Sequence, residues 1–523
     1  MEATKNTSEF SLLGHKPSLY VLFFTEMWER FSYYGMRALL VLFLTTAMID
    51  GGWGWSNEEA LGLYGIYTGL VYLTPIFGGL IADKFLGYQK AVALGALIMT
   101  LGHASMAIET PTSLYIGLTC LILGNGLFKP NVTSIVSGLY DKHQEKKDGA
   151  FTIFYMGVNA GAFLGIMLCG YVGEKVSWSW GFGLAGIFMF LGMLQFWFGR
   201  PLFEKVGLSP KEDLHEKELE AEENKSHGKG VGVKEAHVPS NVQRDRYIVV
   251  GILAFFTIFF WAAFEQAGGS MTIFANNYTN RILEGGSANI FKIVNTLITV
   301  IPLAVITWVI FKLFAQTFSR ITLSNTILGF SFLIIWGIVI WMLYREFNSD
   351  SAEVPASWFG ILNSLFIITL APLFSKIWES KYNPSAAMKF GIGLILLGAG
   401  FGFLAFGSQS IPQGAETAAV SMIWLIFAYL FHTLGELCIS PVGLSYVSKL
   451  VPAKLIGMMF GIWYLAIFIG NFSAGKLGGM IDKITAEYSL MTFFLIFTIV
   501  PAGAGVLLIL INPVMKKLMH GVR

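Results

Sequence analysis

The chain has 523 residues, of which 54% are hydrophobic, 15% aromatic and only 13% charged, and its formal net charge at pH 7 is +2. About a quarter of the residues in an average soluble domain are charged. The composition therefore excludes a soluble enzyme and a disordered protein, and the near-zero net charge gives no basic excess for a nucleic-acid partner. Long apolar segments indicate instead a protein that crosses the lipid bilayer many times.

Fourteen apolar runs of about twenty residues are predicted to be membrane-spanning helices, because a helix satisfies its own backbone hydrogen bonds in hydrocarbon. They cover residues 18–48, 58–82, 88–108, 112–138, 150–172, 180–199, 246–278, 290–315, 322–346, 355–378, 385–408, 421–448, 455–481 and 489–512. A charged linker at 200–245 separates the first six runs from the last eight. The expected fold class is an all-α polytopic membrane protein.

The short loops after the even-numbered runs are rich in Lys and Arg, whereas the opposite loops are poor in them. The positive-inside rule assigns the basic loops to the cytoplasm. An even number of spans then leaves the N-terminal segment 1–17 and the C-terminal tail 513–523 on the cytoplasmic side. No cleavable signal peptide is expected, since the first apolar run contains charged residues.

The first run carries a polar stripe that is unusual for a membrane helix. Its members are Glu26, Glu29, Arg30, Tyr33, Tyr34 and Arg37. At about 100° per residue, these six positions fall within an arc of roughly 140°. A charged side chain at mid-membrane costs about 2.5–3.5 kcal/mol, so the stripe indicates a functional surface. Snorkelling of the side chain to the interface is the alternative explanation, and it suits Glu26 better than Arg37.

Later runs contain further polar residues at membrane depth: Lys129, Glu265 and Glu436 are charged, and Asn159 and Asn363 are neutral. A buried ion pair is weak evidence for stability, whereas pairs that form and break between two halves suit a transporter. The two asparagines can read a substrate amide from either side, or they can hold two helices together.

Aromatic and metal-ligating residues give weaker signals. Tyr72 and Trp463 can line a pocket, or they can face lipid or the helix core. The histidines of the linker, at positions 215, 227 and 237, are too far apart to fit a ligand spacing, so a polytopic membrane enzyme with a metal site is not favoured. We expect no metal and no cofactor.

Five segments carry recognisable motifs: EMWERFSYYG at 26–35, GLIADKFLG at 79–87, GNGLFKPN at 124–131, FYMGVNAG at 154–161 and GELCISPVGL at 435–444. The first matches the E-x-x-E-R-F-x-Y-Y-G motif of the proton-dependent oligopeptide transporters (POT or PTR), a branch of the major facilitator superfamily. The last three resemble other signatures of that family, and the second resembles a loop of the superfamily. The resemblance covers nearly the whole membrane region.

This resemblance implies a major facilitator fold with two six-helix bundles and two additional helices. Residues 18–199 would form the N-terminal bundle, followed by the cytoplasmic linker 200–245 and core helix 7 at 246–278. The segment NPSAAMKF at 383–390 resembles the family's loop after core helix 8. The runs within 290–346 would then be an inserted hairpin, and 355–512 would hold core helices 8–12.

The resemblance also implies a role for each matching residue. For the substrate, it implies Arg37 and Lys129 at the peptide carboxylate, Glu436 at the ammonium, Asn159 and Asn363 at the backbone, and Tyr34, Tyr72, Trp463 and Ser440 in side-chain pockets. For proton coupling and gating, it implies Glu26, Glu29, Arg30 and Glu265.

The function implied by the resemblance is a proton-coupled symporter that imports di- and tripeptides by alternating access and is not an enzyme. The expected setting is the bacterial inner membrane, with the proton as coupling ion, the lipid bilayer as partner, no nucleic acid, and a functional monomer. The alternative is a relative that moves another small zwitterion or anion, such as a peptide-like drug or nitrate. Glu436 disfavours nitrate, because a substrate without an ammonium group gives that carboxylate no function.

Overall fold

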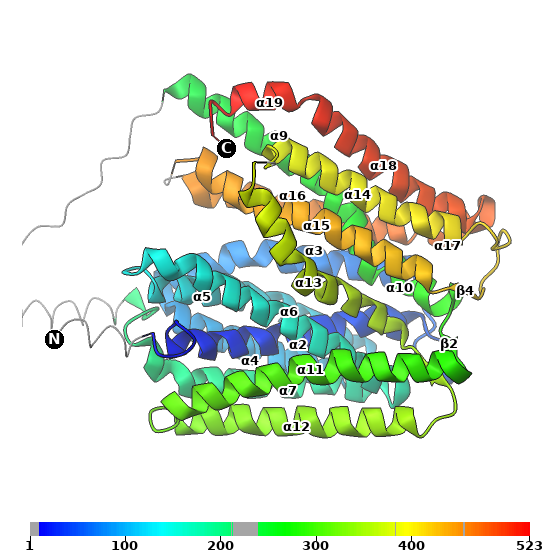
Figure 1. Ribbon diagram of the computed structural model, residues 1–523, viewed down its shortest axis with the longest axis horizontal. Coiled ribbons are helices and arrows are strands. Elements are labelled where there is room, and N and C mark those ends of the chain that lie inside the picture. The colour runs from blue at the N-terminus through cyan, green and yellow to red at the C-terminus, as the bar shows by residue number, and fades with distance from the viewer. Residues whose placement is uncertain (1–9, 211, 213–238, 382, 453–454, 523) are drawn as a thin grey trace, which may run out of the picture. The chain divides into compact units, whose positions relative to one another are not determined.

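The structure, a computed structural model, describes residues 10–210, 212, 239–381, 383–452 and 455–522. All fourteen predicted spans are helical, which confirms the all-α fold class. They are α2 (Pro17–Thr45), α3 (Asn57–Ile81), α4 (Tyr88–Met106), α5 (Pro111–Leu139), α6 (Gln144–Lys175), α7 (Trp178–Gly199), α9 (Ser240–Phe264), α11 (Gly285–Thr317), α12 (Thr322–Phe347), α13 (Ile361–Glu379), α14 (Ala386–Gly407), α15 (Ile423–Leu450), α16 (Ile456–Gly478) and α18 (Leu490–Leu510) (Figure 1).

Within the described residues, twelve helices are long and apolar enough to cross a membrane. The two further spans, α2 and α4, lie outside that set. In α2 the reason is the polar stripe, because every 18-residue window of this helix includes at least three charged residues.

Short elements connect the long helices. They are η1 (Met48–Asp50), η2 (Ala82–Leu86), η3 (Arg200–Phe203), η4 (Glu265–Gly268), α10 (Ser270–Ile273), η5 (Phe274–Tyr278), β1 (Thr279–Asn280), β2 (Ile282–Leu283), β3 (Ala352–Glu353), η6 (Ala356–Gly360), β4 (Val420–Ser421), α17 (Ile481–Glu487) and α19 (Asn512–Leu518). Strands β2 and β3 pair in an antiparallel register, with Ile282 opposite Glu353.

The seventh span is interrupted, whereas the sequence predicted one uninterrupted helix over 246–278. The helix α9 ends at Phe264, and η4, α10 and η5 follow in turn. The physical reason is the pair Gly268 and Gly269: the backbone of Gly269 has φ −114° and ψ −108°, which is outside the helical region. Glu265 is the first residue after the regular helix and therefore lies at the break.

The chain divides into two compact units. Unit 1 comprises residues 1–55, 74–209 and 279–364, and unit 2 comprises residues 56–73, 210–278 and 365–523. In unit 1, α2 packs against α6 and α7, and α4 packs against α5 and α7. In unit 2, α14 packs against α15 and α18, and α9 packs against α16.

The helices α11 and α12 occupy the residues of the expected hairpin and belong to unit 1. In that unit, α12 packs along α7, and α11 contacts α2 (Figure 1). The outward surface of the hairpin is apolar: Leu333 on α12 is 72% exposed and Phe311 on α11 is 67% exposed. This surface is suited to lipid.

Candidate functional site

The stripe on α2 forms a buried ion network inside unit 1. The Nε atom of Arg30 lies 3.0 Å from Oε1 of Glu26 and 2.5 Å from Oε2 of Glu29. The three residues are between 0% and 4% exposed. One guanidinium therefore compensates two carboxylates that have lost their water, which is the arrangement that buried charges require.

A residue that the sequence analysis did not select completes this network. Asn125 on α5 is 1% exposed, and its Nδ2 donates a hydrogen bond of 2.9 Å to Oε1 of Glu29. Asn125 precedes Lys129 by four residues and so lies on the same face of α5. The charge of Lys129 also acts on Glu26. The spacing from Lys129 is the signal that would have identified Asn125.

The remaining predicted residues of α2 lie one and two turns further along the helix. The guanidinium of Arg37 lies 5.7 Å from the ring centroid of Tyr34 and 6.0 Å from that of Tyr33. Arg37 and Tyr34 are both half-buried. Unit 1 therefore brings the charged and phenolic residues of α2 together along one helix, as the 140° arc predicts.

Close packing between α6 and α2 positions Asn159. A Cβ atom on Gly161 would lie 2.2 Å from the carbonyl oxygen of Met27, so the two backbones approach each other as only small residues allow. Asn159 is 5% exposed, and its Nδ2 donates to the carbonyl oxygen of Tyr155 at 3.1 Å. The other predicted asparagine, Asn363, is half-buried in the first turn of α13.

In unit 2, the broken seventh span positions Glu265. This residue is 1% exposed, and its Oε2 accepts a hydrogen bond of 3.1 Å from the hydroxyl of Tyr64 on α3. The next residue, Gln266, donates from Nε2 to the carbonyl oxygen of Ala474 on α16 at 2.9 Å. Hydrogen bonds to α3 and to α16 thus fix the position of the break. Tyr64 is a partner of Glu265 that was not predicted from the sequence.

The other predicted residues of unit 2 lie on α3, α15 and α16. The rings of Tyr72 and Trp261 lie 5.7 Å apart. Trp463 is 4% exposed, and a Cβ atom on Gly443 would lie 2.3 Å from its ring, so this glycine is needed for the close approach of the indole. Glu436 is half-buried and Ser440 is exposed.

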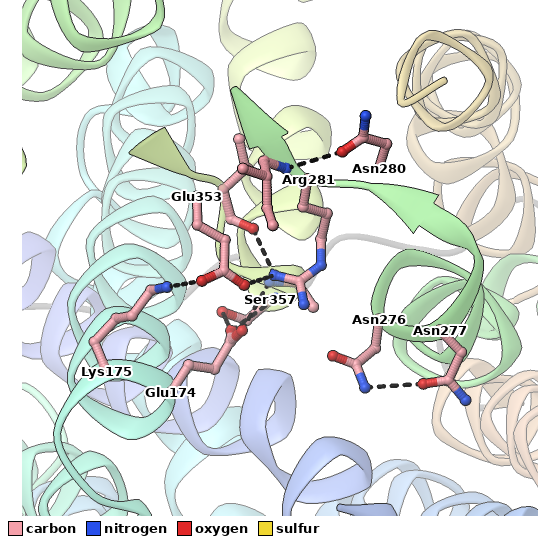
Figure 2. A network of polar contacts seen from close by, with 11 residues as sticks. Glu174, Lys175, Asn276, Asn277, Asn280, Arg281, Glu353 and Ser357 are labelled. Atoms are coloured by element: carbon pink, nitrogen blue, oxygen red, sulfur yellow. Dashed lines mark hydrogen bonds and ion pairs between the residues drawn. The ribbon is translucent and has the colours of Figure 1, made fainter. Parts of the chain in front are cut away.

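A second polar cluster, which the sequence analysis missed, lies at the end of unit 1 where α6 meets η6 (Figure 2). Oε2 of Glu174 accepts a hydrogen bond of 2.8 Å from the backbone N–H of Ala356, and Oε1 accepts one of 2.9 Å from that of Ser357. The hydroxyl of Ser357 donates a third bond to Glu174 at 2.5 Å. One carboxylate thus caps the start of η6 from another helix.

Glu353 on β3 forms the other half of this cluster, which Figure 2 also shows. It pairs with Lys175 at the end of α6 and, at 3.1 Å, with Arg281. Burial alone would raise the pKa of Glu353, but the hydrogen bonds and charges of Lys175 and Arg281 outweigh it and hold the pKa below its ordinary value of 4.5. The ionised form is therefore favoured in the folded protein, and this contribution to stability is present above about pH 4.5 and is lost as the pH falls through the lowered pKa.

Among the residues that the structure describes, no group of three or more His, Cys, Asp or Glu side chains has an arrangement that could hold a metal ion.

Comparison with known proteins supplies the family. The model of the POT family matches residues 89–221 and 331–494, which is more than half of the chain. "Peptide transporter YePEPT" of Yersinia enterocolitica subsp. palearctica serotype O:3 (strain YE-P4) is 31% identical over 99% of this chain and 98% of its own length. The "Di-/tripeptide transporter" of Lactococcus lactis subsp. cremoris is 31% identical over 99% of both chains.

Solved structures with the same fold lead to the same family. A crystal structure of a peptide transporter POT in complex with sulfate is 28% identical, with a TM-score of 0.72 over 97% of this chain and 96% of that chain. A mutant form in complex with alafosfalin, also 28% identical, has a TM-score of 0.73 with the same coverage. Sequence, fold and motifs agree that this multi-pass membrane protein belongs to the POT family.

Proposed function

We propose that the protein is a proton-coupled symporter that imports di- and tripeptides by alternating access. Its relatives from Yersinia enterocolitica and Lactococcus lactis are named a peptide transporter and a di-/tripeptide transporter, and each aligns with nearly the full chain. Proton coupling is supported by one observation: the buried guanidinium of Arg30 forms ion pairs with both Glu26 and Glu29.

The substrate half of the proposal rests on charge and hydrogen-bonding capacity. A short peptide carries a carboxylate at one end and an ammonium at the other. Arg37 and Lys129 supply cations for the first, and Glu436 supplies an anion for the second. The amides of Asn159 and Asn363 can bind any peptide backbone, which allows one site to accept many sequences.

The aromatic and hydroxyl residues complete this proposed site. Tyr34, Tyr72, Trp463 and Ser440 are assigned to the pockets that receive the peptide side chains. Rings with adaptable surroundings suit such pockets, because they contribute apolar contact without requiring one particular partner.

Proton coupling follows from the shared cation. Adding a proton to one carboxylate of α2 removes its charge, so Arg30 is held by the other carboxylate alone. Glu265 is assigned a parallel role at the break in the seventh span, where Tyr64 is its hydrogen-bond partner. Protonation would thereby weaken the contact between Arg30 and a carboxylate of α2, and it would change the contact between Glu265 and Tyr64. Alternating access requires contacts that are exchanged in this way.

The proposal includes a location and an organisation. The protein would act as a monomer in the bacterial inner membrane, with both termini in the cytoplasm because the basic loops mark that side. Residues 18–199 would form the first bundle, 246–278 and 355–512 the second, and 290–346 an inserted hairpin. The proton is the coupling ion, no cofactor takes part, and the protein catalyses no chemical reaction.

Uptake into proteoliposomes tests the whole proposal. Purified protein is reconstituted, and accumulation of labelled dialanine is measured with and without an inwardly directed proton gradient. Accumulation above the equilibrium level is expected only with the gradient, and unlabelled trialanine should compete. Equal uptake with and without the gradient, or competition by nitrate in place of the tripeptide, would contradict the proposal and favour a carrier of another solute.

The variant Glu436→Gln tests the ammonium contact. Binding of free-amine peptides should fall much more than binding of their N-acetylated forms, since only the former offer a cation to Glu436. Glu416→Gln is a matched control, because Glu416 is an exposed residue before β4. Equal loss for both peptide forms would remove this role from Glu436 and leave the transport test unaffected.

A further inference from the structure

A cavity of about 830 Å³ lies at one end of unit 1. Four separate segments line it: the chain that enters α2, the loop between α5 and α6, the region of η3, and the turn between α11 and α12. The turn of the hairpin therefore faces the same space as the N-terminal helices. None of the residues assigned to transport lines this cavity.

Each of the four segments contributes one cation to the cavity: Lys16, Lys142, Lys205 and Arg320. Lys142, Lys205 and Arg320 are exposed, and they come from three separate segments of the lining. Ser18 in the first turn of α2 also lines the cavity, and the first N–H groups of a helix have no partner within the helix. All of these groups favour an anion.

The lining of the cavity has fewer acidic than basic residues. Asp141 and Glu204 line the cavity, and Asp141 already lies 3.6 Å from Lys147, which is outside the lining. The lining thus includes four cations and two carboxylates, and one of these carboxylates lies beside a lysine outside the lining. His143 lines the cavity as well and lies 3.6 Å from Glu145.

The apolar surface next to the cavity indicates the source of the anion. The end of α11 that leads to the cavity exposes Trp308 by 49% and Phe311 by 67%, and Phe318, directly after the helix, is 46% exposed. Free phosphate would gain nothing from these side chains, whereas the acyl chains of a lipid would cover them. Basic pockets beside membrane helices on the cytoplasmic side are suited to anionic headgroups.

We propose that this cavity binds the phosphate headgroup of an anionic phospholipid, with the acyl chains lying along α11. The lipid would connect the hairpin, through Arg320, to the α5–α6 loop and η3, through Lys142 and Lys205. A direct contact already joins the hairpin to the segment that enters α2, since Ser11 and Gln316 exchange two hydrogen bonds of 2.7 Å and 3.0 Å. The proposal does not depend on the transported substrate.

The test compares two double variants that remove the same number of charges. Lys205→Gln with Arg320→Gln removes two cations of the cavity. Lys516→Gln with Lys517→Gln is the control, because these exposed lysines lie on α19 in unit 2. Delipidated protein in detergent is titrated with dioctanoyl phosphatidylglycerol, dioctanoyl phosphatidylcholine or inorganic phosphate, and bound lipid is counted by native mass spectrometry.

Wild-type protein and the control should bind phosphatidylglycerol in preference to phosphatidylcholine, and the cavity variant should lose at least about tenfold in affinity for phosphatidylglycerol. The charge-retaining pair Lys205→Arg with Arg320→Lys should keep most of the affinity, which separates loss of charge from loss of fold. Unchanged binding in the cavity variant, equal binding of phosphatidylcholine, or cavity-dependent binding of inorganic phosphate as tight as that of the lipid would each overturn the proposal.

Discussion

The cap that Glu174 provides for η6 allows a quantitative prediction. In the variant Glu174→Ala, the backbone N–H groups of Ala356 and Ser357 and the hydroxyl of Ser357 all lose their acceptor. These groups begin the short helix that follows the hairpin, and the residue at its own N-cap, Pro355, makes no side-chain hydrogen bond to them. We therefore expect the substitution to lower the stability of unit 1, where α6 and η6 meet.

The magnitude follows from the three hydrogen bonds. A hydrogen bond to a charged group contributes about 1.5–3 kcal/mol. Glu174 is only half-buried, so water can replace part of what is lost, and the three bonds are not additive. A net loss of about 2–4 kcal/mol is therefore expected. The midpoint shifts by about 2–4 °C per kcal/mol for 150–250 residues and by less for a unit as large as unit 1, so the midpoint of thermal unfolding should fall by at least about 3 °C.

Thermal unfolding in detergent, followed by intrinsic tryptophan fluorescence, measures this change. Asp350→Ala is the matched control, because Asp350 is an exposed acidic residue in the segment between α12 and β3. Glu174→Gln should give an intermediate loss, since the amide oxygen can still accept while the charge and one acceptor atom are gone. A midpoint for Glu174→Ala within 1 °C of the control would refute the reasoning that the carboxylate is the effective cap.

Three further substitutions test other contacts. Asn125→Leu removes the amide donor of the buried Glu29, so it should lower stability by about 1.5–3 kcal/mol and reduce gradient-driven uptake; a variant with unchanged melting would show that the bond is dispensable. Tyr64→Phe removes the hydroxyl bonded to Glu265, and it should slow gradient-driven uptake more than peptide exchange at equal pH on both sides; equal slowing would contradict a role in coupling. Glu353→Gln should cost less than about 1 kcal/mol at pH 7, because the pair is partly exposed, and should reduce the loss of stability between pH 5 and pH 3 seen in thermal unfolding; an unchanged acid limb would contradict the lowered pKa.

Hydropathy predicts this fold well because the bilayer imposes a simple rule on the backbone. Each apolar run must be helical in hydrocarbon, and all fourteen are. The stripe on α2 was also predictable, since Glu26, Glu29 and Arg30 are neighbours along one helix and their spacing alone determines the face. Local periodicity therefore accounts for both the spans and the ion network of α2.

Contacts between distant segments were not predictable in the same way. Glu174 and Glu353 each resemble an ordinary loop carboxylate in the sequence, and only the packing of α6 against η6 and β3 gives them their partners. The break at Glu265 depends on two glycines that many membrane helices tolerate without a break. Asn125 was not predicted for a simpler reason: its motif also contains Lys129, and the charged residue was selected because charge is the rarer feature inside a membrane.

The hairpin contacts the rest of unit 1 at both of its ends and in the middle. The cluster around Glu353 holds one end, and the bonds between Ser11 and Gln316 hold the other. Between them, the ring of Phe332 on α12 lies 5.5 Å from that of Trp28. Trp28 stands between Glu26 and Glu29 in the sequence, and at 100° per residue it points away from both.

The two faces of α2 therefore have different partners. The polar face holds the buried ion network, and the opposite face packs through Trp28 against Phe188 of α7 and Phe332 of the hairpin. Because the ions need a fixed geometry to compensate one another without water, the aromatic contacts on the back of α2 help to position the charges on its front. The hairpin therefore supports α2, because its residue Phe332 contacts Trp28 of the helix that carries the family's most specific motif.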